Sequence, residues 1–229
     1  MDEGRAVAVI LAAGAGRRVG AEIPKAFLPI GERPMLAVSA ATAAASPAIH
    51  AIVATAPPGY EDEANGCLEG LAIACTVVTG GDTRQASVRA ALAAIAPDVA
   101  IVVIHDAARP FAPPDLFTAV ADAVVDGADG AVPVLPVADT VKQVDGGMIA
   151  GTVDREGLGL AQTPQAFRLA PLRRAHEAAA EAGREVTDDA MLLEGEGTVV
   201  TLPGDPMNVK ITTMLDLAWA EARMGGVGG

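Results

Sequence analysis

The chain has 229 residues with a formal net charge of −13 at pH 7; 51% of its residues are hydrophobic and 3% are aromatic. A chain of this length, with a core rich in small aliphatic residues, suits one α/β unit. The acidity argues against nucleic acid as a partner, because phosphate backbones require a basic face. Two cysteines, Cys67 and Cys75, give no disulfide framework or metal-ligand spacing. No stretch approaches the ~18 apolar residues of a membrane span, so we expect a cytoplasmic protein without a membrane partner.

Short β-branched apolar runs alternate with helical patterns along the first 135 residues. We expect strands at Ala6–Leu11, Ala51–Thr55, Thr76–Thr79, Val99–Ile104 and Gly130–Leu135. We expect helices between them at Pro34–Ala45, Ala86–Ile95 and Pro114–Val125. This alternation is typical of an α/β fold with a mostly parallel, Rossmann-like twisted sheet and helices on both faces.

The remainder of the chain begins with a segment that breaks this alternation. Residues 137–154 read as two polar β-like pieces joined by Asp145-Gly146-Gly147, a strong hairpin signal. A polar hairpin buries little of itself, so we expect an arm that reaches another subunit, with a plain surface hairpin as the alternative. The whole chain, 1–229, is then one domain with 137–154 as a dimerisation arm. Later helices are expected at Pro171–Ala182, Asp188–Glu194 and Thr213–Arg223, and strands at Thr198–Leu202 and Val209–Thr212.

The loop Leu11–Lys25 follows the first expected strand, at the edge of the sheet where open α/β folds bind ligands. Small residues let its backbone N–H groups approach a phosphate or a base: Ala12, Ala13, Gly14 and Gly16. Cations follow in the same loop: Arg17, Arg18 and Lys25. The dinucleotide motif GxGxxG is excluded because Val19 replaces its third glycine, and a Walker A loop is excluded because Gly-Lys-Ser/Thr is absent. A tight turn with solvated arginines is the alternative.

The segment Gly80–Ser87, GGDTRQAS, places two glycines before the start of an expected helix. A helix N-terminus suits an anion or a base edge, with Asp82 and Ser87 as candidate contacts. Helix capping by Asp82 or Thr83 explains the same residues equally well.

The segment His105–Pro110, HDAARP, ends the expected central strand. Asp106 would enter the crevice, where a carboxylate can meet ribose hydroxyls or a phosphate-bound Mg²⁺. Arg109 adds a fixed cation. His105 has no suitably spaced metal-binding partners, so we interpret it as structural.

Three weaker segments lie further along the chain: Thr152–Arg155 (TVDR), Thr163-Pro164-Gln165 and Asn208–Thr212 (NVKIT). TVDR and NVKIT each place one cation near the end of an expected strand. A salt bridge would explain either cation alone.

Together and in this order, the segments resemble the 2-C-methyl-D-erythritol 4-phosphate cytidylyltransferases of the non-mevalonate isoprenoid pathway, from about Val7 to Trp219. HDAARP with TVDR and TPQ separates this family from general sugar nucleotidyltransferases. The chain departs from the family at Ala26, where a Gln usually follows the lysine, which affects a nearby loop contact. The resemblance implies a nucleotide-diphospho-sugar transferase fold with a protruding β-hairpin arm.

The resemblance also implies a reaction. CTP and 2-C-methyl-D-erythritol 4-phosphate, a small sugar-alcohol phosphate, would give 4-diphosphocytidyl-2-C-methyl-D-erythritol and pyrophosphate. The acceptor phosphate would attack the α-phosphate in line, without a general base. Mg²⁺ or another divalent cation would be held mainly by the triphosphate, with Asp106 nearby and no direct protein ligand set. A homodimer would share its sites through the arm.

Roles follow at the matching positions. Arg18 and Lys25 would stabilise charge on the α-phosphate, and Arg155 and Lys210 would position the acceptor phosphate. The CTP-binding set would be Ala12, Ala13, Gly14, Gly16, Gly81, Asp82, Ser87 and Asp106. The acceptor-binding set would be Asp106, Ala107, Arg109, Thr140, Arg155, Thr163 and Lys210.

Three other interpretations remain open. A ribitol 5-phosphate cytidylyltransferase shares much of the motif set, and a sugar-1-phosphate nucleotidyltransferase would use another nucleotide. A non-catalytic nucleotide-binding regulator is disfavoured, because a sensor has little use for four cations: Arg18, Lys25, Arg155 and Lys210.

Overall fold

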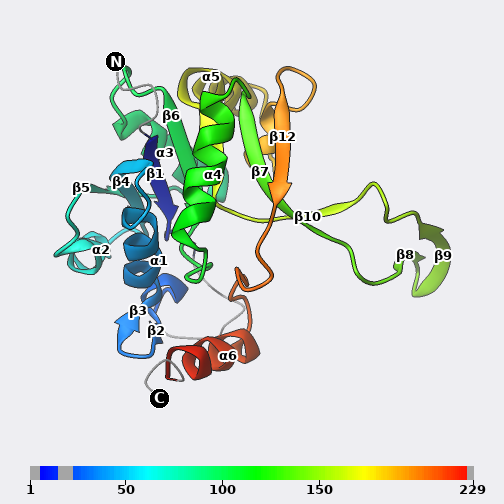
Figure 1. Ribbon diagram of the computed structural model, residues 1–229, viewed down its shortest axis with the longest axis horizontal. Coiled ribbons are helices and arrows are strands. Elements are labelled where there is room, and N and C mark those ends of the chain that lie inside the picture. Colours follow the sequence, from blue (N-terminus) through cyan, green and yellow to red (C-terminus); the bar gives the residue numbers. More distant parts are fainter. Residues whose placement is uncertain (1–5, 15–22, 226–229) are drawn as a thin grey trace.

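The computed structural model describes residues 6–14 and 23–225. Within these residues an eight-stranded sheet forms the centre, with helices packed along it (Figure 1). Its strands are β1 (Ala6–Leu11), β4 (Ile49–Ala56), β5 (Ala74–Thr79), β6 (Ile101–Asp106), β7 (Gly130–Pro136), β10 (Gly159–Ala161), β11 (Gln165–Arg168) and β12 (Val199–Pro203). The helices are α1 (Met35–Ala44), α2 (Glu61–Leu68), α3 (Arg84–Ala94), α4 (Pro114–Val125), α5 (Leu169–Glu181) and α6 (Met214–Gly225), with 3-10 helices η2 (Lys25–Phe27) and η3 (Ala190–Leu192).

The sheet is mostly parallel, as the sequence predicts. Its strand order is β10-β7-β11-β6-β1-β4-β5, with β12 also paired to β7. β1 runs parallel to β4 and β6, whereas β11 lies antiparallel between β6 and β7. The register of β1 places Leu11 beside both Thr55 and Asp106. The carboxyl ends of three strands therefore meet at one edge, where ligands bind in this class of fold.

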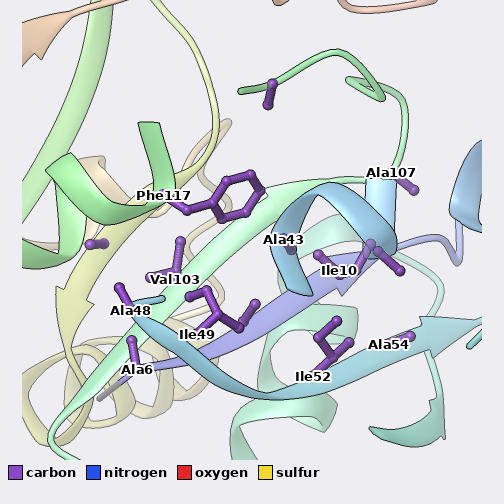
Figure 2. Packing of buried hydrophobic residues seen from close by; sticks show 14 of the residues in the cluster. Ala6, Ile10, Ala43, Ala48, Ile49, Ile52, Ala54, Val103, Ala107 and Phe117 are labelled. Atoms are coloured by element: carbon purple, nitrogen blue, oxygen red, sulfur yellow. The ribbon is translucent and has the colours of Figure 1, made fainter. Parts of the chain in front are cut away.

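Alternate residues of each central strand face opposite sides of the sheet, and each side has its own core. On one side, Ile10 and Ile52 pack with residues of α1, α2 and α4, including Phe117 (Figure 2). On the other side, Val7 and Val9 pack against α3 and α5. Central strands buried on both faces are continuously apolar, which is why the sequence pattern located them well.

A third, smaller cluster attaches the C-terminal helix to the body. Ile211 and Leu217 pack with Ile30 and Met35, beside the short strand pair β2 (Pro29–Ile30) and β3 (Arg33–Pro34). The Ile211 amide also donates a 2.8 Å hydrogen bond to the Ala108 carbonyl. This contact fixes the segment around Lys210 next to the end of β6.

The hairpin expected at residues 137–154 forms as β8 (Val141–Asp145) paired with β9 (Met148–Val153). Gly146 and Gly147 at its tip have φ of 54° and 82°, the left-handed conformation that tight hairpin turns require. Figure 1 shows this arm standing away from the central sheet. Its apolar side chains are open to solvent: Val144 is 62%, Met148 74% and Ile149 68% exposed.

Some predicted elements differ from the structure. The strand expected at Val209–Thr212 is wrong, because this segment joins no strand and instead bonds to the loop after β6. The helix expected at Asp188–Glu194 shortens to the single 3-10 turn of η3. Helix α2 and the short strands β2, β3, β10 and β11 were not predicted. Within the described residues, no helix has the length and apolarity needed to cross a membrane.

Candidate active site

Hydrogen bonds link the carboxyl ends of three central strands, β1, β4 and β6. The Ala12 amide donates to Thr55 twice, to its carbonyl at 3.1 Å and to Oγ1 at 3.2 Å. The Ala107 amide donates to the Leu11 carbonyl at 3.1 Å, and Ser39 Oγ donates to the Ala107 carbonyl at 2.7 Å. These bonds hold the start of the first loop and the end of β6 side by side.

The Gly80-Gly81 turn packs directly onto the first loop. A Cβ atom on Gly80 would lie 2.2 Å from the Ala13 Cβ and 2.9 Å from Ser87 Oγ. A Cβ atom on Gly81 would lie 2.5 Å from the Ala86 Cβ. Both positions require glycine, because a Cβ would push Gly80 off the first loop and Gly81 off Ala86 of α3. The two sequence motifs form one ledge, made of Ala13, Gly80 and Gly81.

The structure settles how helix α3 is capped. Thr83 is the N-cap, and its Oγ1 accepts a 3.0 Å hydrogen bond from the Ala86 amide. Asp82, one residue earlier, is exposed and does not cap the helix. Ser87 Oγ is buried against the ledge and accepts from the Gly81 amide at 3.1 Å. The Asp82 carboxylate is therefore not used to cap the helix.

Asp106 lies at the end of β6 between two cations. Lys210 Nζ is 2.6 Å from its Oδ2, and Arg84 Nε is 3.6 Å from its Oδ1. Burial alone would raise the pKa of Asp106, but the charges of Lys210 and Arg84 hold this pKa well below its usual range. Asp106 is therefore a carboxylate throughout the physiological pH range.

His105 helps to fix the backbone of Asp106 from inside the fold. Its Nε2 lies 3.1 Å from the Arg109 carbonyl, which can only accept, so Nε2 carries the proton. Nδ1 then accepts from Thr163 Oγ1 at 3.0 Å, and the same hydroxyl accepts from the Asp106 amide at 3.0 Å. Burial lowers the pKa of His105 to about 4. The structure thus agrees with the structural interpretation of His105.

Arg109 is used to fix the segment that carries Lys210. Its Nη1 donates to the Asn208 carbonyl at 2.8 Å, and its Nη2 donates to the Ala161 carbonyl at 3.4 Å. Buried Asn208 in turn donates from Nδ2 to the Thr163 carbonyl at 2.8 Å. The sequence interpretation missed Asn208, although the residue lies within the NVKIT motif.

Lys25 joins the site from the far end of the first loop. Its Nζ donates a 2.8 Å hydrogen bond to the carbonyl of Ile211, the residue after Lys210. Lys25 therefore contacts the short segment that carries Lys210, although the two lysines are 185 positions apart in the sequence (210 − 25). Two further predicted site residues, Gly16 and Arg18, lie outside the described residues.

Thr140 lies in the arm and Arg155 directly follows it, so neither belongs to the edge of the central sheet. Both are exposed, and the Arg155 guanidinium donates to the Ala138 carbonyl across the base of the hairpin. Both flank the β8–β9 hairpin, which Figure 1 shows standing away from the central sheet.

The described residues contain no group of three or more His, Cys, Asp or Glu side chains that could hold a metal ion. Asp106 supplies one hard oxygen-bearing group at the edge of the sheet. A Mg²⁺ ion carried by a triphosphate needs only one or two carboxylates from the protein, so Asp106 fits that limited role.

The family model described as IspD, 2-C-methyl-D-erythritol 4-phosphate cytidylyltransferase, matches residues 6–226. The chain belongs to this family. The cytidylyltransferase of Streptomyces coelicolor is 44% identical, over 95% of this chain and 84% of that protein. The Saccharopolyspora erythraea cytidylyltransferase is 45% identical, over 94% of this chain and 97% of its own length.

Solved structures of cytidylyltransferases share the fold. The 4-diphosphocytidyl-2C-methyl-D-erythritol synthase of Anaerococcus prevotii superposes with a TM-score of 0.86 at 29% identity, covering 98% of this chain and 100% of that one. The cytidylyltransferase of Thermus thermophilus gives 0.78 at 35% identity, covering 94% and 97%. The family resemblance stated from the sequence motifs is therefore confirmed.

Proposed function

We propose that the chain joins CTP and 2-C-methyl-D-erythritol 4-phosphate, giving 4-diphosphocytidyl-2-C-methyl-D-erythritol and pyrophosphate. Family membership supports this reaction, and one structural observation carries its mechanism. Lys25 contacts the segment that carries Lys210, and Lys210 contacts Asp106, next to the ledge of Ala13, Gly80 and Gly81. Cations gathered at the carboxyl edge of an α/β sheet suit the transfer of a phosphorylated group.

The chemistry needs positioning and charge stabilisation more than a protein nucleophile. The acceptor phosphate is already ionised at neutral pH and can attack the α-phosphate in line. Its approach to the triphosphate is opposed by like charge. We assign Arg18 and Lys25 to the α-phosphate, and Arg155 and Lys210 to the acceptor phosphate. Each preorganised cation of this kind typically contributes about 3 kcal/mol to lowering the barrier.

The ledge is proposed to carry the cytidine part of CTP. The absence of a Cβ lets Gly80 and Gly81 pack against Ala13 and Ala86, and we assign the backbone of this turn to the base and ribose. The proposed CTP-binding residues are Ala12, Ala13, Gly14, Gly16, Gly81, Asp82, Ser87 and Asp106.

The acceptor side is proposed to combine residues of the body with residues of the arm: Asp106, Ala107, Arg109, Thr140, Arg155, Thr163 and Lys210. Thr163 and Arg109 already donate to His105 and to backbone carbonyls respectively. We therefore assign to them the shaping of this side, by holding Asp106 and Asn208 in place.

A divalent cation such as Mg²⁺ is proposed as the cofactor. It would be held mainly by the phosphates of CTP, with Asp106 as the nearest protein carboxylate. When bound, it would neutralise charge on the triphosphate and the leaving pyrophosphate. The protein residues would then align the acceptor phosphate with the α-phosphate of CTP for in-line attack and disfavour other orientations of the two phosphates.

We further propose a homodimer in which residues 137–154 of one subunit complete the site of the other, each subunit being a single domain. Four exposed large apolar side chains on the arm support this: Val144, Met148, Ile149 and Val153. Mixing Arg18→Ala and Arg155→Ala proteins provides the test. Random exchange would restore about a quarter of wild-type activity, because half the dimers are mixed and each has one intact site. Folded heterodimers without activity would contradict site sharing.

Pyrophosphate release tests the activity itself. We expect it only when CTP is combined with methylerythritol phosphate, among four nucleotides and two acceptors, the second being ribitol 5-phosphate. Release with ribitol 5-phosphate would favour the alternative cytidylyltransferase, and release with no pair would favour a regulator. A cytoplasmic location stays a prediction, which cell fractionation would check.

A further inference from the structure

Arg84 is a cation at the site to which the proposed reaction gives no role. It is the first residue of α3 and lies between two carboxylates from distant parts of the chain. Its Nη2 is 2.7 Å from Asp189 Oδ2, and its Nε is 3.6 Å from Asp106 Oδ1. A cation at a helix N-terminus opposes the helix dipole, so this placement depends on the two carboxylates.

Asp189 anchors the other end of this arrangement. Its side chain is fully buried just before η3, and His176 Nε2 on α5 lies 2.9 Å from its Oδ1. Burial alone would raise the pKa of Asp189, but the His176 hydrogen bond and the Arg84 charge lower it. A buried carboxylate of this kind is tolerated only with such partners. Asp106, Arg84, Asp189 and His176 thus form a continuous polar chain.

The chain has one end in the crevice and the other in the core between α3 and α5. His176 is buried, and its Nδ1 has no hydrogen-bond partner within the described residues. Asp189 and His176 make no contact with the edge of the sheet except through Arg84, among the interactions described. Arg84 is therefore the direct link between these two residues and the Asp106 carboxylate.

We propose that Arg84 is a positioning residue, held by Asp189 and His176, that keeps the Asp106 carboxylate aligned while Lys210 turns to the acceptor phosphate. This rests on the proposed function. Lys210 is the closer partner of Asp106, but its side chain is 42% exposed and it is assigned to substrate. Arg84 has no such competing assignment. Its planar guanidinium contacts both carboxylates, which the single ammonium of a lysine cannot do in the same geometry.

A double-mutant cycle tests this proposal. Arg84→Gln is made in the wild-type protein and in the Asp106→Asn background, and kcat and both KM values are measured. We expect Arg84→Gln to lower kcat about tenfold in the first case and less than about twofold in the second, because its effect passes through Asp106. The KM for CTP should change little. Arg89→Gln, an exposed arginine on the same helix, is the matched control and should leave kcat unchanged.

The outcomes separate the possible roles of Arg84. An equal loss of kcat in both backgrounds would overturn the proposal, since Arg84 would then act on substrate or on the fold. An unchanged kcat in Arg84→Gln would overturn it as well. If the Gln variant does not fold, Arg84→Lys replaces it in the same cycle, and the same comparison of the two backgrounds decides. Inactivity of the wild-type protein with CTP and methylerythritol phosphate would instead contradict the proposed function.

Discussion

At the scale of single residues, the site depends on how the environment fixes charge. Asp106 stays ionised because Lys210 and Arg84 lie next to it, and His105 stays neutral because it is buried. The sequence pointed to Asp106 and to Lys210 through the motifs HDAARP and NVKIT. The family resemblance placed both in the acceptor-binding set, but the direct 2.6 Å ion pair between them, across 104 positions of sequence (210 − 106), was not predicted.

Removing the Lys210 charge should impair catalysis without unfolding the protein. Lys210→Gln is expected to lower kcat/KM about 10²–10³-fold, the usual loss for one charge-stabilising donor. Steady-state kinetics and a thermal unfolding midpoint would be measured together. Lys142→Gln on the arm is the matched control, because its Nζ donates a hydrogen bond to Thr152 of the same arm and no role is assigned to it. Equal losses in both variants would contradict the role of Lys210.

His105 should make stability depend on pH. Its folded pKa of about 4 lies below the value near 6.5 of an unfolded chain, so only the unfolded state gains a proton between these values. The free energy of unfolding should therefore fall by about 3 kcal/mol as pH decreases from 7 to 4. Urea unfolding at several pH values would measure the fall. His105→Gln should be less stable at pH 7 yet show a shallower decline, and an identical decline would exclude His105 as the cause.

At the scale of elements, local patterns located most of the sheet and its helices. β1 and α4 have the predicted bounds, because continuous apolar strands and a proline at a helix start are signals within a few residues. Helix α2 was missed because only Ala64 and Leu68 of its eight residues are buried. Strand β11 was missed because a four-residue antiparallel insertion depends on β6 and β7, which lie far from it in sequence.

The contact between Gly80 and the first loop can be tested as a property of two packed elements. Gly80→Ala would place a methyl group against the Ala13 Cβ, and overpacking of this kind costs about 1–3 kcal/mol. We expect a lower free energy of unfolding and a higher KM for CTP. Gly66→Ala in α2 is the control, since a Cβ there meets nothing within 4 Å and should add about 0.5–1 kcal/mol of stability. A neutral Gly80→Ala would contradict the ledge.

At the scale of the whole molecule, the arm is the feature that a single chain does not explain. It exposes several large apolar side chains, and Figure 1 shows it standing away from the central sheet that carries Asp106. A partner subunit would account for both observations. The sequence predicted the hairpin because its turn signal is local. What the hairpin contacts depends instead on assembly with another subunit.

Ile149→Asp should weaken the proposed dimer. The charged side chain would replace an exposed apolar one, and sedimentation should show a shift toward the 23.0 kDa monomer with a parallel loss of activity. Gln143→Asp adds the same charge to the same arm at a polar position and is the control. A dimer equally stable in both variants would place the interface elsewhere on the molecule.

By itself, the sequence determined the mostly parallel α/β fold, the arm and the family, because all of these depend on signals carried by neighbouring residues. Only the tertiary structure decided which cations surround Asp106, why Gly80 must lack a side chain, and that Arg84 joins Asp106 to a buried Asp189 and His176. The physical reason is distance along the chain. Hydrophobic period and turn chemistry act over a few positions, whereas these contacts join residues brought together only when the strands align their carboxyl ends.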